Sequence, residues 1–335
     1  MATVTDILER IRTVDLESQL GLRAPSPPVV VSLVGDDLSL IRVKPSRRGK
    51  PVLEAVQSRT LSEGVVPTSI FDANPADAGK LTLTLRELLE ASGTRPGRAS
   101  LVLPDNLAKV SLFTLPERPA NRRVLDELVR AKMRKAIPFR LKEASLSYES
   151  LPSEGKGVTM LVVVVRRSLT DRFEQAFEAC GCRLGLIDLS TPNLLNLCRE
   201  KVTEAGDGDT AILNCAGTHF SLVIMRNQNI IFYRSKSLAQ EPGEGMAANS
   251  GLLRELSSSF SYYEEKLGGE GVGRVILRNV ANDNDALEAR LGQIGCGRIE
   301  TLTSSDAIDL APGVGFSGSQ ATVLAPAIGV VAGRG

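Results

Sequence analysis

Two adjacent carboxylates lie in the first turn that can be recognised from the sequence pattern. Asp36 and Asp37 follow Gly35, between an apolar run at residues 29–34 and an alternating run at 38–43. A glycine–aspartate turn between such runs is typical of a β-hairpin. Paired carboxylates can bind a divalent cation, but calcium and magnesium need further oxygen ligands, which this turn lacks. We therefore predict no metal site.

A second turn carries hydrogen-bond donors instead of acids, between apolar runs at residues 210–215 and 220–226. Backbone amides and a hydroxyl in such a turn can face an anion such as a phosphate. The turn residues concerned are Asn214, Ala216, Gly217 and Thr218. His219, the single histidine, follows them and could act as a base. A lone histidine at the start of a strand is more often structural, and we favour that role.

No other group of residues forms a pattern of catalytic chemistry. The five cysteines have neither an even count nor disulfide-framework spacing, which favours reduced thiols in a cytosolic protein. There is no P-loop and no GxSxG motif, and no second cysteine or histidine pair to complete a zinc site. The sequence therefore predicts no enzyme.

Composition narrows the function classes further. Lysine and arginine total 40 against 39 acidic residues, and the formal net charge of +1 gives no indication of nucleic-acid binding. The longest apolar run, residues 160–165, is far shorter than the about 20 residues that span a bilayer. The first residues, MATVTDILER, are too acidic for a signal peptide. We expect a cytoplasmic location.

The hydrophobic pattern predicts an α/β chain whose opening strand–turn–strand theme, at residues 29–58, restarts at residues 210–234. Between them a strand–strand–helix–strand order predicts a small α+β unit. Its helix, about residues 121–136, should end before Pro138 because proline disfavours the helical region. A terminal helix is expected at residues 321–331, either kinked at Pro326 or starting there.

Three segments carry a family resemblance: LVLPDNLAKVSLFTLPE, KAIPFRLKEASLSYESL and MLVVVVRRSLTDRFEQAFEACGCRLGLIDLSTPNLLNL. They are similar to the middle of the type IV pilus assembly protein PilM, a family with the actin-like fold of the cell-division protein FtsA. The resemblance extends more weakly over residues 29–332. It implies a two-lobed, ribonuclease H-like α/β fold with an inserted α+β subdomain of the FtsA/PilM type.

The resemblance also implies a division of the chain. The expected parts are a leader and linker at residues 1–28, subdomain 1A at 29–98, the inserted subdomain 1C at 99–185, a return to the first half at 186–206, a second half with a shortened 2B region at 207–318, and a C-terminal helix at 319–335 that packs on the first half.

Actin-like ATPases bind nucleotide between their halves, and this chain departs from their turns. Leu33 replaces an aspartate, and Asp36 and Asp37 replace hydroxyl residues. Like charges about 4 Å apart repel by several kcal/mol in a partly desolvated site, so this turn should reject a phosphate. Asn214 replaces a second aspartate, and Asn279 opens a turn expected to be Ser-Gly-Gly, where the β-branched Val280 blocks a positive φ. Residues 238–252 are too short for the usual wall of the cleft.

We therefore expect a pseudo-ATPase without cofactor that works as a cytoplasmic scaffold at the inner face of the inner membrane. The resemblance implies a PilN-like bitopic partner, whose tail would lie between the first half and the inserted subdomain, beside other components of the pilus platform. The candidate apolar contacts are Leu112, Phe113, Leu128 and Phe139, each of them equally consistent with a core role.

A cluster of basic residues in the inserted subdomain offers a second type of contact. It includes Arg122, Arg123 and Arg130. It is either a solvated helix face or a docking face for an acidic partner or anionic lipid. Two alternatives for the whole chain remain open: an ATP–magnesium-binding actin-like ATPase, and a cytoplasmic component of type II secretion resembling GspL.

Overall fold

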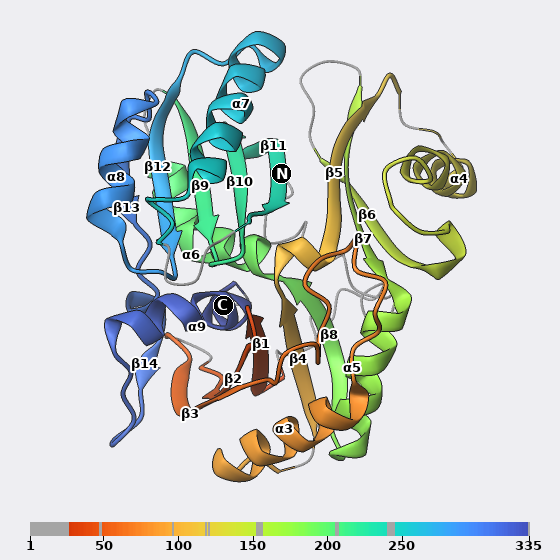
Figure 1. Cartoon of the computed structure of the whole chain (residues 1–335), viewed down its shortest axis with the longest axis vertical. Helices are drawn as coiled ribbons and strands as arrows, with labels where there is room; N and C mark the ends of the chain where they lie inside the picture. The colour runs from red at the N-terminus through yellow and green to blue at the C-terminus, as the bar shows by residue number, and fades with distance from the viewer. Residues whose placement is uncertain are drawn as a thin grey trace.

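The computed structural model describes residues 27–46, 49–95, 97–117, 119, 121–151, 157–204, 208–239 and 245–333. The predicted leader lies outside these residues except for Pro27 and Pro28, and so does part of the stretch 238–252. The described elements form two lobes with a third, smaller sheet beside them (Figure 1).

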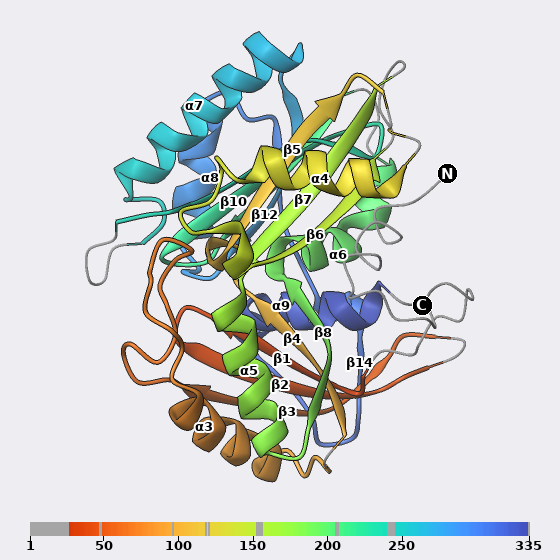
Figure 2. The same ribbon diagram turned by 90° about the vertical axis from the view of Figure 1, so that its right-hand side faces the viewer.

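The first lobe contains a mixed sheet with the strand order β14-β3-β2-β1-β4-β8. Helices α3 and α5 cover one face of this sheet, and α9 lies on the other (Figure 2). The parallel pairing of β1 with β4 and of β4 with β8 brings the carboxyl ends of these strands to the same edge. The elements are β1 (Val29–Val34), β2 (Asp37–Lys44), β3 (Val52–Thr60), β4 (Arg98–Leu103), β8 (Arg183–Leu189), β14 (Asp309–Leu310), α3 (Ala78–Ala91) and α5 (Arg167–Ala179).

The second lobe contains a sheet with the order β11-β10-β9-β12-β13. Its outer face packs against α7 and α8, whereas Ile212, Val223 and Ile276 on the other face join the core of the first lobe. Helix α6 connects the two lobes (Figure 1). The elements are α6 (Ser190–Glu204), β9 (Asp209–Cys215), β10 (His219–Arg226), β11 (Asn229–Ser237), α7 (Ser250–Leu267), β12 (Val272–Asn279), α8 (Asn284–Gln293) and β13 (Arg298–Thr301).

The inserted subdomain is a sheet of order β5-β7-β6 with α4 across its outer face (Figure 2). Strand β7 alternates: Met160, Val162 and Val164 pack under α4, while Val163 and Val165 face the first lobe. The expected bounds 99–185 were too wide, because β4 and β8 pair in the six-stranded sheet. The elements are β5 (Ala108–Leu115), α4 (Arg122–Met133), β6 (Ala144–Leu151) and β7 (Val158–Arg166).

Helix α4 ends at Met133, earlier than the expected residue 136. Pro138 prevents the helix from reaching its own position, because the ring would meet the carbonyl of Arg134, four residues before it. The last turn closes instead with a bond from the Ala136 amide to the Met133 carbonyl.

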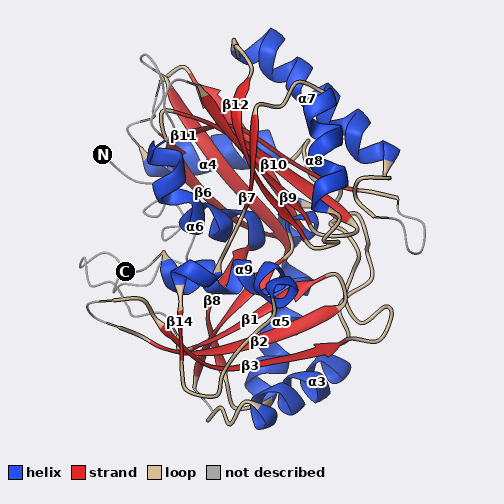
Figure 3. Cartoon of the chain, turned by 90° about the vertical axis from the view of Figure 1, so that its left-hand side faces the viewer, coloured by secondary structure: helices blue, strands red, loops and turns tan. Residues whose placement is uncertain are grey.

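Helix α9 (Gly318–Ala332) lies between the two large sheets and runs through Pro326 without starting there (Figure 3). Its apolar residues pack against β1 and β2 in the first lobe. The chain returns to that lobe before the helix, because β14 pairs in parallel with β3. The second half therefore ends earlier than the expected residue 318.

Candidate functional site

A buried polar cluster lies between the lobes, where elements from both meet. Asp105 follows β4 in a short 3₁₀ turn, Asp105–Leu107. Ser190 and Thr191 begin α6, and Asn214 stands near the end of β9. We call the group the Asp105 cluster; its members are Asp105, Ser190, Thr191, Asn214, Tyr233 and Arg278.

Asp105 is the centre of the cluster and has no solvent exposure. Its carboxylate accepts hydrogen bonds from Ser190 Oγ at 2.8 Å, Thr191 Oγ1 at 2.6 Å and Tyr233 Oη at 2.7 Å, and from the Thr191 amide at 3.2 Å. A helix N-terminus favours negative charge, so the start of α6 stabilises this carboxylate. Burial, and then the charge of Asp105, raises the pKa of Tyr233 well above its ordinary value.

Arg278 supplies the opposite charge and is 1% exposed. Asn214 joins it to the rest of the cluster: its Oδ1 accepts from Arg278 Nη1 at 2.6 Å, and its Nδ2 donates to Thr191 Oγ1 at 2.9 Å. Burial lowers the pKa of Arg278 to about 10, although Asp105 opposes that shift. A buried cation and a buried carboxylate are thus connected through one amide.

Arg278 also ties the second lobe to α9. Its Nε donates to the Thr322 carbonyl at 2.8 Å and its Nη2 to the Val323 carbonyl at 3.2 Å. Pro326 has no backbone N–H, so the Thr322 carbonyl, four residues earlier, has no helical donor. The proline inside α9 thereby leaves an acceptor free for Arg278.

His219 is buried beside this cluster, with 1% exposure, and neither ring nitrogen has a hydrogen-bond partner in the described part of the chain. Burial lowers its pKa to about 4; the charge of Asp105 opposes the shift and that of Arg278 adds to it. The ring is therefore neutral at pH 7.

The first predicted turn is separate from the cluster. Leu33 is 1% exposed and belongs to the first-lobe core, and Gly35 adopts a φ of +59°. Asp36 and Asp37 are exposed, and Thr60 Oγ1 donates to Asp37 Oδ1 at 2.5 Å. Among the described residues, no group of three or more histidine, cysteine, aspartate or glutamate side chains is arranged to hold a metal ion.

The second predicted turn is closed by its own hydrogen bonds. The Ala216 amide donates to the His219 carbonyl at 3.0 Å, and the Thr218 carbonyl accepts from the Leu238 amide at 2.8 Å. Gly217 has a φ of +74°, which glycine adopts easily. Of the predicted turn residues, only Asn214 joins the Asp105 cluster.

The third predicted turn is likewise closed internally. Asn279 is 1% exposed; its Nδ2 donates to Asp283 Oδ1 at 2.7 Å and its Oδ1 accepts from the Ala281 amide at 3.1 Å. Val280 was expected to prevent a positive φ here. The chain adopts one at Asn282 instead, with φ at +59°, because asparagine tolerates the left-handed region.

Two grooves flank the inserted subdomain, one at each edge of its sheet. The first, the β6–β8 groove, has a volume of about 150 Å³ and lies between that sheet and the first lobe. Strands β6 and β8 each end a sheet in the described chain. Val163 and Val165 line the groove together with Glu174 and Asp188, and its lining contains no lysine or arginine. Burial, then Asp171 and Glu178, raises the pKa of Glu174.

The second, the β5–β11 groove, has a volume of about 630 Å³ and lies between the inserted sheet and the second lobe. Leu112 and Phe113 line this groove, and not the β6–β8 groove for which they were candidates. Leu128 is 44% exposed on α4. Phe139 packs beneath the Arg166 guanidinium, 4.2 Å from the ring centre, and lines neither groove.

The predicted basic face is partly neutralised by its own helix. Arg130 pairs with Asp126 at 2.7 Å and Arg123 with Glu127 at 3.3 Å. Arg122 is exposed. Exposed pairs of this spacing contribute little to stability but reduce the positive potential of the face.

The fold places the chain among the actin-like proteins. It belongs to the type IV pilus assembly protein PilM family, whose model matches residues 35–246. A solved PilM–PilN type IV pilus biogenesis complex is similar in structure, with a TM-score of 0.72 and 19% identity over 93% of this chain and 98% of that one. No curated protein matches the chain.

Two further solved structures are less similar to this chain. One is a protein of unknown function with an actin-like ATPase fold from Bacteroides thetaiotaomicron (TM-score 0.49, 11% identity, 81% of this chain and 90% of that one). The other is the cytoplasmic domain of EpsL, an inner-membrane component of the type II secretion system of Vibrio cholerae (TM-score 0.46, 12% identity, 90% of this chain and 94% of that one). In the described residues, no helix has both the length and the apolar character to cross a bilayer.

Proposed function

We propose that the chain is a non-catalytic scaffold of the type IV pilus platform, which holds the cytoplasmic tail of a PilN-like bitopic membrane protein in the β6–β8 groove. The observation that carries this proposal is the composition of the groove: an apolar wall with two carboxylates, between two sheet edges. The chain would then act at the inner face of the inner membrane through this partner. A solved complex of PilM with PilN supports a partner of that kind.

The groove fits such a tail for physical reasons. An extended peptide can add to a free strand edge through main-chain hydrogen bonds, while alternate side chains fill pockets. Val163 and Val165 offer apolar contact. Cytoplasmic segments next to a membrane span are rich in lysine and arginine. Glu174 and Asp188 provide the matching charge.

The proposal includes the absence of ATP chemistry. A triphosphate needs free donors and no nearby anions. The Ala216 amide and the side chain of Asn279 are engaged within their own turns, Asn214 is bonded to Arg278 and Thr191, and Asp105 puts a buried carboxylate between the lobes. These residues do not fit a bound nucleotide, so the lobes would be held together by side chains.

The test measures the affinity of the intact chain for a fluorescein-labelled tail peptide of the PilN-like protein of the same organism. We expect Glu174→Lys to weaken binding about tenfold, because an attractive charge becomes repulsive. Glu63→Lys is the matched control: this glutamate is exposed, lies outside α5 and does not line the groove. Equal affinities for both variants and the wild type would contradict the proposal.

A further inference from the structure

The β5–β11 groove is bounded by two strand edges that approach each other from different sheets (Figure 1). Within the described residues, β5 pairs only with β7 and β11 only with β10. Alternate backbone N–H and C=O groups along a strand at the edge of a sheet have no partner within that sheet. The groove therefore presents two unpaired main-chain edges to the same space.

The groove lining combines apolar and aromatic side chains with polar ones. Phe113 stands on the β5 side and Phe232 on the β11 side. Tyr262 of α7 is 49% exposed, and its ring centre lies 6.0 Å from that of Phe232. Phe232 is only 9% exposed, so Tyr262 is the accessible ring of this pair, and aromatic side chains in a concave site are typical anchors for a protein partner.

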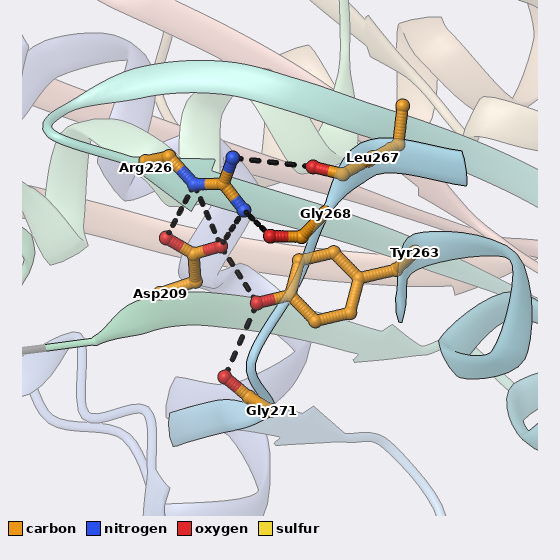
Figure 4. Close-up of polar contacts among 6 residues, drawn as sticks. All are labelled: Asp209, Arg226, Tyr263, Leu267, Gly268 and Gly271. Atoms are coloured by element: carbon orange, nitrogen blue, oxygen red, sulfur yellow. Dashed lines mark hydrogen bonds and ion pairs between the residues drawn. The ribbon is translucent and has the colours of Figure 1, made fainter. Parts of the chain in front are cut away.

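The charges around the groove are positive, and its lining contains no carboxylate. Arg226 is matched by Asp209, which is itself held by Tyr263; burial and the bond to Asp209 raise the pKa of Tyr263 to about 12 (Figure 4). Arg234 and Lys236, by contrast, share the single carboxylate of Glu255.

One further cation contacts a residue that lines the groove. Lys132 lies over the Phe113 ring, 5.6 Å from its centre, and has no ion pair within the described residues. Together with the surplus charge of Arg234 and Lys236, it gives the groove a net positive potential. The β6–β8 groove, with Glu174 and Asp188, has the opposite sign.

We propose that the β5–β11 groove is a second docking site, which takes an extended segment of a partner protein that carries both apolar and acidic side chains on one side. The segment adds as a strand to the β5 or β11 edge. Because side chains two positions apart on a strand point to the same side, Phe232 and Arg234 of β11 share a face, and every second residue of the segment meets either an aromatic ring or a cation. The basic tail proposed for the β6–β8 groove does not suit this site.

The experiment uses the full chain and two short fluorescein-labelled peptides with serine at every second position; the positions between alternate between valine and glutamate in one peptide and between valine and lysine in the other. We expect the glutamate peptide to bind about tenfold more tightly, as two to three exposed charge pairs would produce. Hydrogen–deuterium exchange should show new amide protection confined to residues 112–114 and 229–234. No preference between the peptides, or protection elsewhere, would overturn the proposal.

Paired variants separate the groove from general surface effects. Tyr262→Ala should weaken binding of the glutamate peptide about fivefold by removing an aromatic anchor, while Phe71→Ala removes a 75% exposed aromatic outside the groove and should change nothing. Lys132→Glu should weaken binding, and Lys135→Glu, on a neighbouring exposed position, should not. Equal effects within either pair would contradict the proposal.

Two controls keep the inference independent of the tail-binding proposal. Glu174→Lys, in the β6–β8 groove, should leave binding of the glutamate peptide unchanged. Light scattering should give the full chain and its Tyr262→Ala variant the same molecular mass. If the full chain self-associates and Tyr262→Ala abolishes that association, the occupant is a second copy of the chain and the proposal of a separate partner is wrong.

Discussion

The Asp105 cluster and the β6–β8 groove are built from the same two segments but present opposite surfaces. Leu103 lines the groove, and Asp105, two residues later, is the centre of the cluster. Leu189 lines the groove, and Ser190 enters the cluster. In the cluster the polar groups satisfy one another without solvent, whereas the groove leaves apolar side chains beside open volume.

This difference indicates which region is available to a ligand. A molecule that entered the cluster would have to replace hydrogen bonds that already exist, and each buried group left unpaired costs about 1–3 kcal/mol. A peptide in the groove would remove apolar surface from water without breaking such bonds. We therefore assign stability to the cluster and binding to the groove, and the predictions below test that separation.

The largest effect is expected from Asp105→Ala. The substitution leaves Arg278 as a buried cation without its carboxylate and removes the acceptor for Ser190, Thr191 and Tyr233. Each buried donor left unpaired costs about 1–3 kcal/mol, so the free energy of unfolding should fall by about 3 kcal/mol or more. Urea unfolding should show that loss. Asp36→Ala, in the exposed first turn, should change the free energy of unfolding by less than about 0.5 kcal/mol.

A smaller effect, dependent on pH, is expected from His219. Its pKa is lowered from 6.5 to about 4, so the unfolded chain binds more protons in that interval and stability falls as the pH falls. The loss through this residue should be about 2 kcal/mol between about pH 7 and about pH 5. His219→Leu should remove this part of the acid dependence; an unchanged profile would show that the ring is hydrated or paired.

The expected effect of filling the β6–β8 groove is smaller again. Thr170 lines it, and Thr170→Trp would occupy part of its volume. We expect affinity for the PilN-like tail to fall about tenfold, equivalent to about 1.4 kcal/mol of binding free energy. The free energy of unfolding should change by no more than about 0.5 kcal/mol, as for other surface substitutions. A variant that lost stability but kept its affinity would reverse our assignment of the two regions.

The smallest effect belongs to the first turn. Thr60 Oγ1 donates to Asp37 Oδ1 at the protein surface, and both groups are accessible to water. A double-mutant cycle of Asp37→Ala and Thr60→Ala should give a coupling energy of about 0.5 kcal/mol. A value several times larger would mean that this turn, like the cluster, is a structural element.

Much of the fold follows from local patterns. The run of valines before Gly35 and the alternation after it predict β1 and β2 within one residue, because strand period and turn chemistry act over short distances. Strand β14 could not be found this way: two residues pair with β3 from more than two hundred positions away. The resemblance to PilM predicted the actin-like arrangement that local patterns alone leave open.

The site was harder to predict than the fold. Asn214 was identified from its turn, but neither Asp105 nor Arg278 was predicted as a site residue. Their roles depend on contacts between separate lobes, which no local period encodes. A signal was present, since Arg278 interrupts the otherwise apolar run after Val275 and charged residues are almost never buried unpaired. That signal indicates a partner but does not identify it.

The central claim is that side chains, and not a nucleotide, join the two lobes. Thermal unfolding with and without millimolar magnesium–ATP tests it most directly, because a ligand present at 100 times a Kd of about 50 µM adds about 2.7 kcal/mol to the free energy of unfolding. Our account predicts no shift in the melting temperature. A rise of several degrees with ATP, absent with magnesium alone, would contradict it.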